Sequence, residues 1–193
     1  MQVWVQNTRP RRDTAGQPID CHDGCLRFFG DRFYLYGTRY GDTDGFTPAN
    51  RFVCYSSPDL EAWTFHGELL RAPMGGVCYR PYVVWNPGTR RYVLWFNWYP
   101  ELWEGQFAVG MSTTPQGPFD IVNPDAEVVQ PKPGDHNVFI DDDGRAYLIY
   151  TSIEGDGSGH HGMSVERLDH AYTGSTGENS GVFDTGVEAP AVI

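Results

Sequence analysis

A pattern of four short strands recurs along this chain with a period of about 55 residues. The segments RFYLYGT (32–38), RRYVLWF (90–96) and RAYLIYTS (145–152) are versions of one strand in which apolar and aromatic residues alternate. Each follows a short turn and an earlier apolar strand, and each precedes a third and a fourth strand at the same spacing. Four consecutive strands in every repeat predict the blades of a β-propeller.

An antiparallel sandwich also has closely spaced strands, but nothing in a sandwich requires them to recur at a fixed long period. We therefore predict an all-β fold, with residues 1–193 forming a single partial β-propeller domain of four-stranded antiparallel blades. Blade 1 is expected at about residues 20–70, blade 2 at about 77–123 and blade 3 at about 135–187. The segment GVEAPAVI (186–193) is expected to run from the outer strand of blade 3 into the first strand of blade 4, at 188–193.

Three blades and the start of a fourth do not close a ring, because propellers typically have about four to eight blades. We expect the remaining blades to lie beyond Ile193. An open ring exposes apolar faces that neighbouring blades would otherwise cover. Residues 1–193 alone are therefore expected to self-associate.

The composition excludes several classes of function. A net charge of −11 argues against a nucleic-acid partner, which needs a basic face. No apolar run reaches 18 residues, so no membrane-spanning segment is expected, and the first residues lack the apolar core of a secretory signal. A cytoplasmic protein with reduced thiols is the resulting expectation, and we interpret the cysteines as small buried apolar residues: Cys21, Cys25, Cys54 and Cys78.

Acidic residues stand where the first strand of a predicted blade begins. These residues are Asp23, Asp135 and Glu188, whereas the second blade has Tyr79 and Tyr82 there. Because the first strands line the axis of a propeller, we expect the three acids to converge in one axial cleft. Acids that merely cap strand ends are the structural alternative, but three at the same phase of a repeat favour a site.

Converging carboxylates suit glycoside hydrolysis, in which one carboxyl group donates a proton to the leaving oxygen while another acts as base or nucleophile. A third nearby charge would raise the pKa of the donor by repulsion. The acids of DDDG (141–144) lie in a predicted hairpin turn and are interpreted as turn formers. The pair His160–His161 has no carboxylate or cysteine at ligand spacing, so we expect a loop there and no metal site.

The same motifs resemble glycoside hydrolase family 43, whose members are five-bladed β-propellers. HDGCL at Asp23 resembles the HDPSI-type motif that carries the catalytic base of the family. GDHNVFIDDDGRAYLIY at Asp135 resembles the motif of the aspartate that orients the acid and tunes its pKa, and VEAPAVI at Glu188 resembles the EAP motif of the general acid. The resemblance implies an inverting glycosidase with Asp23 as general base, Glu188 as general acid and Asp135 as the assisting residue.

Within this family, YSSPDLEAWTFHGELL, YRPYVVWNPGTRRYVLWF and MSTTPQGPF are most similar to the exo-β-1,3-galactanase branch. That branch usually has ERPKV where this chain has YRPYV, so Tyr79 replaces a sugar-binding glutamate. It usually has YGE where this chain has YGT, ending at Thr38, and HGG where this chain has HDG, with His22 and Asp23. The substrate therefore stays open among β-galactosides, α-L-arabinofuranosides and β-xylosides of plant-type polysaccharides or oligosaccharides.

Aromatic side chains of the second blade are candidates for stacking on sugar rings. Trp95 alternates within its strand and is expected in the core, whereas WYPELWEG (98–105) is expected to form a loop beyond that strand. The predicted substrate-binding residues are Tyr79, Tyr82, Trp98, Tyr99, Trp103, Thr38 and His22. No cofactor is evident; a structural calcium ion, if present, would be supplied by the later blades.

Two alternatives from other classes remain. A non-catalytic sugar-binding propeller is consistent with the tyrosine at position 79, and these residues alone could also form an inactive fragment of an enzyme. A kelch-like interaction propeller has a similar period but does not need acids where its first strands begin. The presence of all three acids favours the glycosidase.

Overall fold

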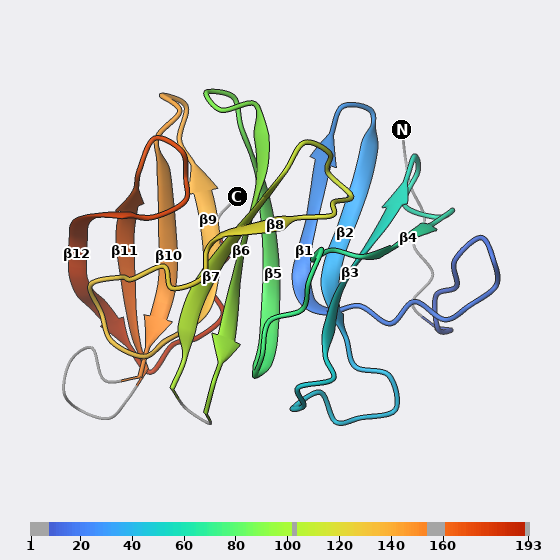
Figure 1. Cartoon of the computed structure of the whole chain (residues 1–193), viewed down its shortest axis with the longest axis horizontal. Helices are drawn as coiled ribbons and strands as arrows, with labels where there is room; N and C mark the ends of the chain where they lie inside the picture. Colours follow the sequence, from blue (N-terminus) through green and yellow to red (C-terminus); the bar gives the residue numbers. More distant parts are fainter. Residues whose placement is uncertain (1–7, 102–103, 154–160, 192–193) are drawn as a thin grey trace.

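The computed structural model describes residues 8–101, 104–153 and 161–191. In these ranges the chain forms twelve β-strands and no helix, which confirms the all-β prediction. The strands assemble in chain order into three four-stranded antiparallel sheets (Figure 1). No helix long and apolar enough to cross a membrane occurs in the described ranges.

Each sheet is built from four consecutive strands. The first contains β1 (His22–Phe29), β2 (Arg32–Arg39), β3 (Arg51–Ser57) and β4 (Thr64–Glu68). The second contains β5 (Val77–Asn86), β6 (Arg91–Tyr99), β7 (Gln106–Ser112) and β8 (Asp120–Asn123). The third contains β9 (Pro133–Ile140), β10 (Ala146–Ser152), β11 (Gly162–Leu168) and β12 (Ser175–Thr185).

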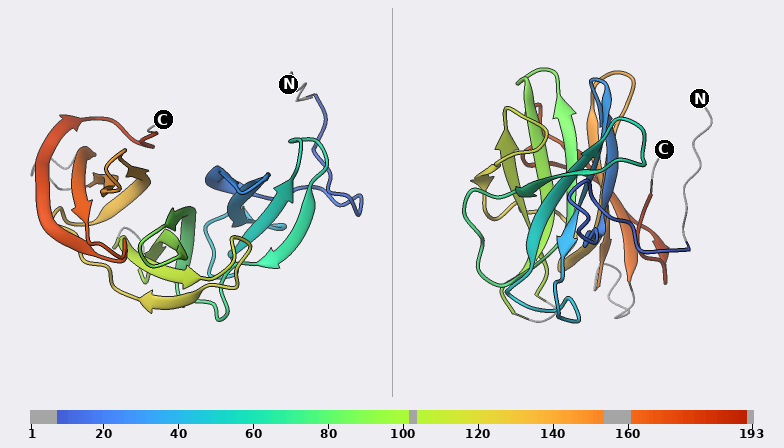
Figure 2. Two further views of the ribbon diagram at one scale, coloured as in Figure 1. Left: turned by 90° about the horizontal axis from the view of Figure 1, so that it is seen from above. Right: turned by 90° about the vertical axis from the view of Figure 1, so that its right-hand side faces the viewer.

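The three sheets follow one another around an open arc. Seen from above, β1, β5 and β9 lie on its concave side, and β4, β8 and β12 lie on its convex side (Figure 2). The second sheet stands between the other two, with β5 in contact with both β1 and β9. This arrangement of sheets is that of a partial propeller, as the repeat predicted.

Burial along the middle strands follows from this arrangement. In β6 every residue from Val93 to Asn97 is buried, because the second sheet is covered on both faces. In β10 the residues alternate between buried and partly exposed from Ala146 to Tyr150, since one face of the third sheet is left uncovered. A strand buried on both faces is expected to be apolar throughout, and the sequence YVLWF within β6 has that character.

Aromatic side chains join the sheets to one another. Phe96 of β6 meets Phe52 of β3 edge to face, with ring centroids 5.0 Å apart. On the other face of β6, the indole Nε1 of Trp95 donates a hydrogen bond of 2.7 Å to the Tyr172 carbonyl in the third sheet's β11–β12 connection. Trp95 is fully buried, which confirms that it belongs to the core.

Two predicted boundaries are wrong. The strand β6 continues through Trp98 and Tyr99, which pair with Cys78 and Val77, so these aromatic residues do not lie in a loop. At the other end of the chain, β12 stops at Thr185 and residues 186–191 form no strand. Gly186, the residue after the strand, adopts a left-handed conformation with φ of 72°.

The cysteines are all free thiols, as expected. Cys25, Cys54 and Cys78 are buried in the core, which agrees with their interpretation as small apolar residues. Cys21 is partly exposed and differs from that expectation because it precedes β1.

A buried carboxylate fastens the outer part of the third sheet. Glu166 of β11 is fully buried and accepts hydrogen bonds from the Val129 amide at 3.0 Å and the Tyr150 hydroxyl at 2.8 Å. It also accepts hydrogen bonds from the Asn179 amide group at 3.1 Å and from the Ser175 hydroxyl. One side chain thus joins β10, β11, β12 and the segment that leads into β9.

We predict that Glu166→Gln lowers the free energy of unfolding by about 2 to 3 kcal/mol, because an amide group would turn donor toward donor in this buried cluster. Urea unfolding of the wild type and of the Glu166→Gln variant measures the change in the free energy of unfolding. Glu178→Gln is the matched control, since Glu178 lies on β12 with its side chain exposed and paired to Arg167 at the surface. Equal unfolding midpoints for the Glu166 variant and the control would contradict the prediction.

Candidate active site

Each inner strand carries a β-bulge near its start. Between two paired positions, two inner-strand residues oppose a single residue of the middle strand. The bulged residues are Asp23 and Gly24 in β1, Arg80 and Pro81 in β5, and Gly134 and Asp135 in β9. Bulges re-aim side chains and are over-represented beside active sites. The two aspartates therefore both lie at bulges, one residue apart in register.

A cavity of about 330 Å³ lies where these bulges meet. Asp23 and Asp135 line it from the first and third sheets, with Arg80 of the second sheet also in its wall. Its remaining lining residues are mostly aromatic: Tyr40, Phe46, Tyr79, Asn97 and Tyr99. Carboxylates in an aromatic pocket of this size suit a small polar ligand with apolar faces.

Asp23 is held by three hydrogen-bond donors. Its Oδ1 accepts from the Tyr40 hydroxyl at 3.2 Å. Its Oδ2 accepts from the Thr38 hydroxyl at 3.2 Å and from the Arg80 backbone amide at 3.2 Å. Burial raises the pKa of Asp23 above its ordinary value, and these three hydrogen bonds oppose the rise because they stabilise the ionised form.

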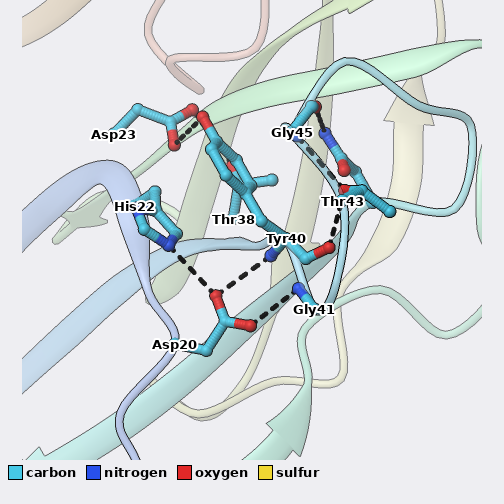
Figure 3. Close-up of polar contacts among 9 residues, drawn as sticks. Asp20, His22, Asp23, Thr38, Tyr40, Gly41, Thr43 and Gly45 are labelled. Carbon is cyan, nitrogen blue, oxygen red and sulfur yellow. Dashed lines mark hydrogen bonds and ion pairs between the residues drawn. The ribbon is translucent and has the colours of Figure 1, made fainter.

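Asp20 holds Tyr40 in place from the side opposite to Asp23 (Figure 3). Its carboxylate accepts from the backbone amides of Tyr40 at 3.0 Å and Gly41 at 2.7 Å. It also lies 3.2 Å from Nε2 of His22, whose ring stacks on Tyr40 with centroids 4.1 Å apart. The segment that follows β2 is thereby fixed so that its tyrosine hydroxyl reaches Asp23.

Asp135 makes an ion pair with Arg80, whose Nε lies 2.5 Å from Oδ1. Burial raises the pKa of Asp135, the charge of Arg80 opposes that rise, and the nearby charge of Glu188 adds to it. The Ala189 backbone also forms a hydrogen bond with Asp135. These interactions bring the segment that carries Glu188 next to Asp135.

Glu188 lies near Asp135 but does not line the same cavity, so the three acids do not all converge in one cleft as expected. Its side chain is 55% exposed and forms an ion pair with Nδ1 of His161. The following residues, 189–191, line a second cavity of about 320 Å³ that shares Asp23 and Arg80 with the first. Glu188 is thus at the rim of the site, while its neighbours belong to the wall.

The predicted substrate-binding residues are divided among several positions. Tyr79 and Tyr99 line the cavity with the aspartates, and Tyr82 lines the second cavity, where its hydroxyl accepts a 3.0 Å hydrogen bond from Arg27. Thr38 is fully buried and donates to Asp23, so it holds the carboxylate. His22 stacks on Tyr40 outside both cavities.

One of the predicted aromatic platforms, Trp98, does not line the site, and another, Trp103, is not tested. Trp98 packs against the core, on the face of β6 opposite to Asn97 and Tyr99, because side chains alternate along a strand. Trp103 lies outside the described residues, as does His160. In the described ranges, no group of three or more His, Cys, Asp or Glu side chains is arranged to hold a metal ion.

Several residues of the site were missed by sequence reasoning. Arg80 stands at the bulge position of β5 that Asp23 occupies in β1, so a search for the repeat position rather than for acids would have found it. Asn97 occupies the position of Thr38 in the second sheet and could have been found in the same way. Tyr40 and Phe46 come from an irregular segment after β2, which has no counterpart in the repeat and gave no signal.

Several solved structures have a similar fold. An exo-β-1,3-galactanase from Clostridium thermocellum is 26% identical over 92% of this chain and 41% of its own, with a TM-score of 0.75. An exo-β-1,3-galactanase variant from Phanerochaete chrysosporium, determined with β-1,3-galactotriose, is 25% identical over 90% of this chain and 41% of its own, also with a TM-score of 0.75. A β-1,3-galactosidase at 24% identity covers 90% of this chain and 39% of its own with a TM-score of 0.76, and shows the fold alone.

This chain spans about two fifths of the length of these solved structures, between 39% and 41%. Among curated protein sequences, none matches it. The family model described as glycosyl hydrolases family 43 matches residues 17–193, which is nearly the whole chain. The chain therefore belongs to glycosyl hydrolase family 43.

Proposed function

We propose that this chain carries the acid–base machinery of an inverting glycosidase that acts on β-linked galactosides. The observation that carries the proposal is the meeting of Asp23 and Asp135 in one aromatic cavity, with Glu188 beside Asp135. In the proposed mechanism Asp23 is the general base, Glu188 is the general acid and Asp135 assists the acid. Each assignment follows the motif resemblance, and the side-chain environments are consistent with it.

The surroundings of Asp23 suit a base. Three donors favour its ionised form, and an ionised carboxylate can take a proton from a water molecule that attacks the anomeric carbon. Glu188, with an exposed side chain at the rim, can reach the oxygen of a leaving group that extends toward solvent. Inversion needs this division of roles, because the water attacks one face of the sugar ring while the leaving group departs from the opposite face.

The aromatic walls suit a sugar ring. Tyr79, Tyr99 and Phe46 surround the cavity, and the apolar CH face of a pyranose stacks on such rings. The hydroxyl of Tyr79 donates a 2.7 Å hydrogen bond to the Gly45 carbonyl, which fixes the ring in the wall. The structures from Clostridium thermocellum and Phanerochaete chrysosporium, at 26% and 25% identity, are both exo-β-1,3-galactanases, so a terminal β-1,3-linked galactose is the substrate that we favour over arabinofuranosides and xylosides.

A non-catalytic sugar-binding propeller is the second candidate. The observation in its favour is Tyr79, which stands where the galactanase branch usually has a glutamate. Such a protein would bind β-1,3-galactobiose without cleaving it. If calorimetry shows binding of β-1,3-galactobiose and no galactose is released, the protein is a sugar-binding propeller and the proposal of a glycosidase is wrong.

We predict that Glu188→Gln lowers the rate of β-1,3-galactobiose hydrolysis by roughly 100-fold to 10,000-fold, as expected for loss of a general acid. The same variant should retain much more activity on dinitrophenyl β-galactoside, whose leaving group needs no proton. Asp23→Asn, which removes the base, should be slow on both substrates. Equal losses on both substrates for Glu188→Gln would contradict the acid role, as would full activity of either variant.

We predict that Tyr40→Phe moves the acidic limb of the pH profile of kcat/KM upward by about 0.5 to 1 pH unit. The Tyr40 hydroxyl lowers the pKa of Asp23, so its removal makes the base protonate at a higher pH as the pH falls. The control is Tyr92→Phe, near the start of β6 and at the opposite end of the strand from Tyr99, which lines the cavity. A profile that does not move, or that moves downward, would disprove the assignment of Asp23 as the titrating base.

A further inference from the structure

Arg80 occupies an unusual backbone position in the wall of the cavity. It lies at the bulge of β5, at the register position that Asp23 occupies in β1. Both residues have left-handed backbone conformations, with φ of 54° for Arg80 and 44° for Asp23. Residues other than glycine rarely adopt this conformation, and instances at functional sites are often held there by surrounding contacts.

The two ends of Arg80 contact different carboxylates. Its backbone amide donates to Oδ2 of Asp23 at 3.2 Å, and its side-chain Nε lies 2.5 Å from Oδ1 of Asp135. The side chain of Arg80 is 32% exposed and that of Asp135 is 20% exposed, so the ion pair is partly shielded from water. A single residue therefore spans the first and third sheets through the second.

We infer that Arg80 is a positioning residue that sets the separation of Asp23 and Asp135 and keeps Asp135 ionised. The inference rests on the proposed function, in which both carboxylates act on one sugar. The left-handed conformation directs the backbone amide toward Asp23 while the side chain extends to Asp135, so that one residue fixes both. No role for Arg80 follows from the motif resemblance, which assigns roles to the acids alone.

The charged and titratable groups around Asp135 are few. Arg80 faces it from β5, Tyr99 from β6, and Glu188 from the segment after β12. His136, next in sequence, is buried, and burial lowers its pKa to about 3, so it is neutral over the working pH range. Arg80 is thus the cation that balances Asp135, and its removal should change the titration of Asp135 more than that of Asp23.

The test separates the two contacts of Arg80. Arg80→Gln removes the side-chain ion pair but keeps the backbone amide that binds Asp23. Carboxyl-carbon NMR, without substrate, should show the titration midpoint of Asp135 rising by about 1 pH unit or more, with a smaller rise for Asp23. Arg80→Lys keeps the charge without the planar guanidinium and should give an intermediate rise for Asp135.

The matched control is Arg71→Gln. Arg71 forms an ion pair with Asp120 with the same Nε–Oδ1 distance of 2.5 Å, but both side chains are exposed and lie away from the cavity. Its variant should leave the titration of Asp135 unchanged. An Asp135 midpoint that is the same in folded Arg80→Gln, in Arg80→Lys and in the wild type would overturn the inference.

Activity gives a second and independent measurement. With β-1,3-galactobiose, Arg80→Gln should lower kcat/KM about 10-fold to 100-fold and raise the acidic limb of its pH profile, while Arg80→Lys restores part of both. Because the NMR titration needs no turnover, it tests the effect of Arg80 on Asp135 even if the wild type proves inactive. An inactive wild type would overturn the proposed function alone.

Discussion

The middle sheet holds this structure together because both of its faces are buried. Phe96 packs against the first sheet and Trp95 bonds to the third, from neighbouring positions of the same strand. The sheets on either side each cover one of these faces, so their inner strands are brought to the same side of the arc (Figure 2). The site depends on this packing, because its two aspartates belong to different sheets and line one cavity only when the sheets are packed side by side.

Bulges convert that packing into a site. In a regular strand, successive side chains alternate between the two faces of the sheet. At each bulge, two residues of the inner strand oppose one residue of the middle strand, and the extra residue places an additional side chain near the start of the inner strand. In the first sheet that side chain is Asp23, in the second it is Arg80, and in the third Asp135 follows one position later. The positive charge of Arg80 thus lies between the negative charges of Asp23 and Asp135. It reduces the repulsion that two partly buried carboxylates would otherwise have in one cavity.

Much of the fold could be predicted from the sequence, since the repeat is carried by local alternation of apolar residues. The segments around Tyr36, Trp95 and Tyr150 form the second strand of each sheet, as their shared pattern predicted. The end of β6 was wrong because pairing with β5, rather than local pattern, extends that strand to Tyr99. The segment after β12 differs for another reason: residues 186–191 form no strand in the structure, because an apolar pattern alone does not supply a pairing partner.

The site could be predicted only in part. Sequence reasoning predicted Asp23, Asp135 and Glu188 from motifs and repeat position, and the structure brings the two aspartates into one cavity with Glu188 outside it. It did not find Arg80, because the search looked for acids at the repeat position, and the contacts of Arg80 depend on its backbone amide and left-handed conformation. Nor did it find Tyr40, which depends on the anchoring of an irregular segment by Asp20.

In the proposed mechanism, Asp23 and Glu188 act from opposite faces of one sugar, and Asp135 assists Glu188. The most direct measurement is the anomeric form of the first galactose released from β-1,3-galactobiose, followed by proton NMR before the sugar equilibrates. An inverting base and acid must release the α-anomer first. Release of the β-anomer first would mean that one carboxylate attacks the sugar directly, and the account given for Asp23 would be wrong.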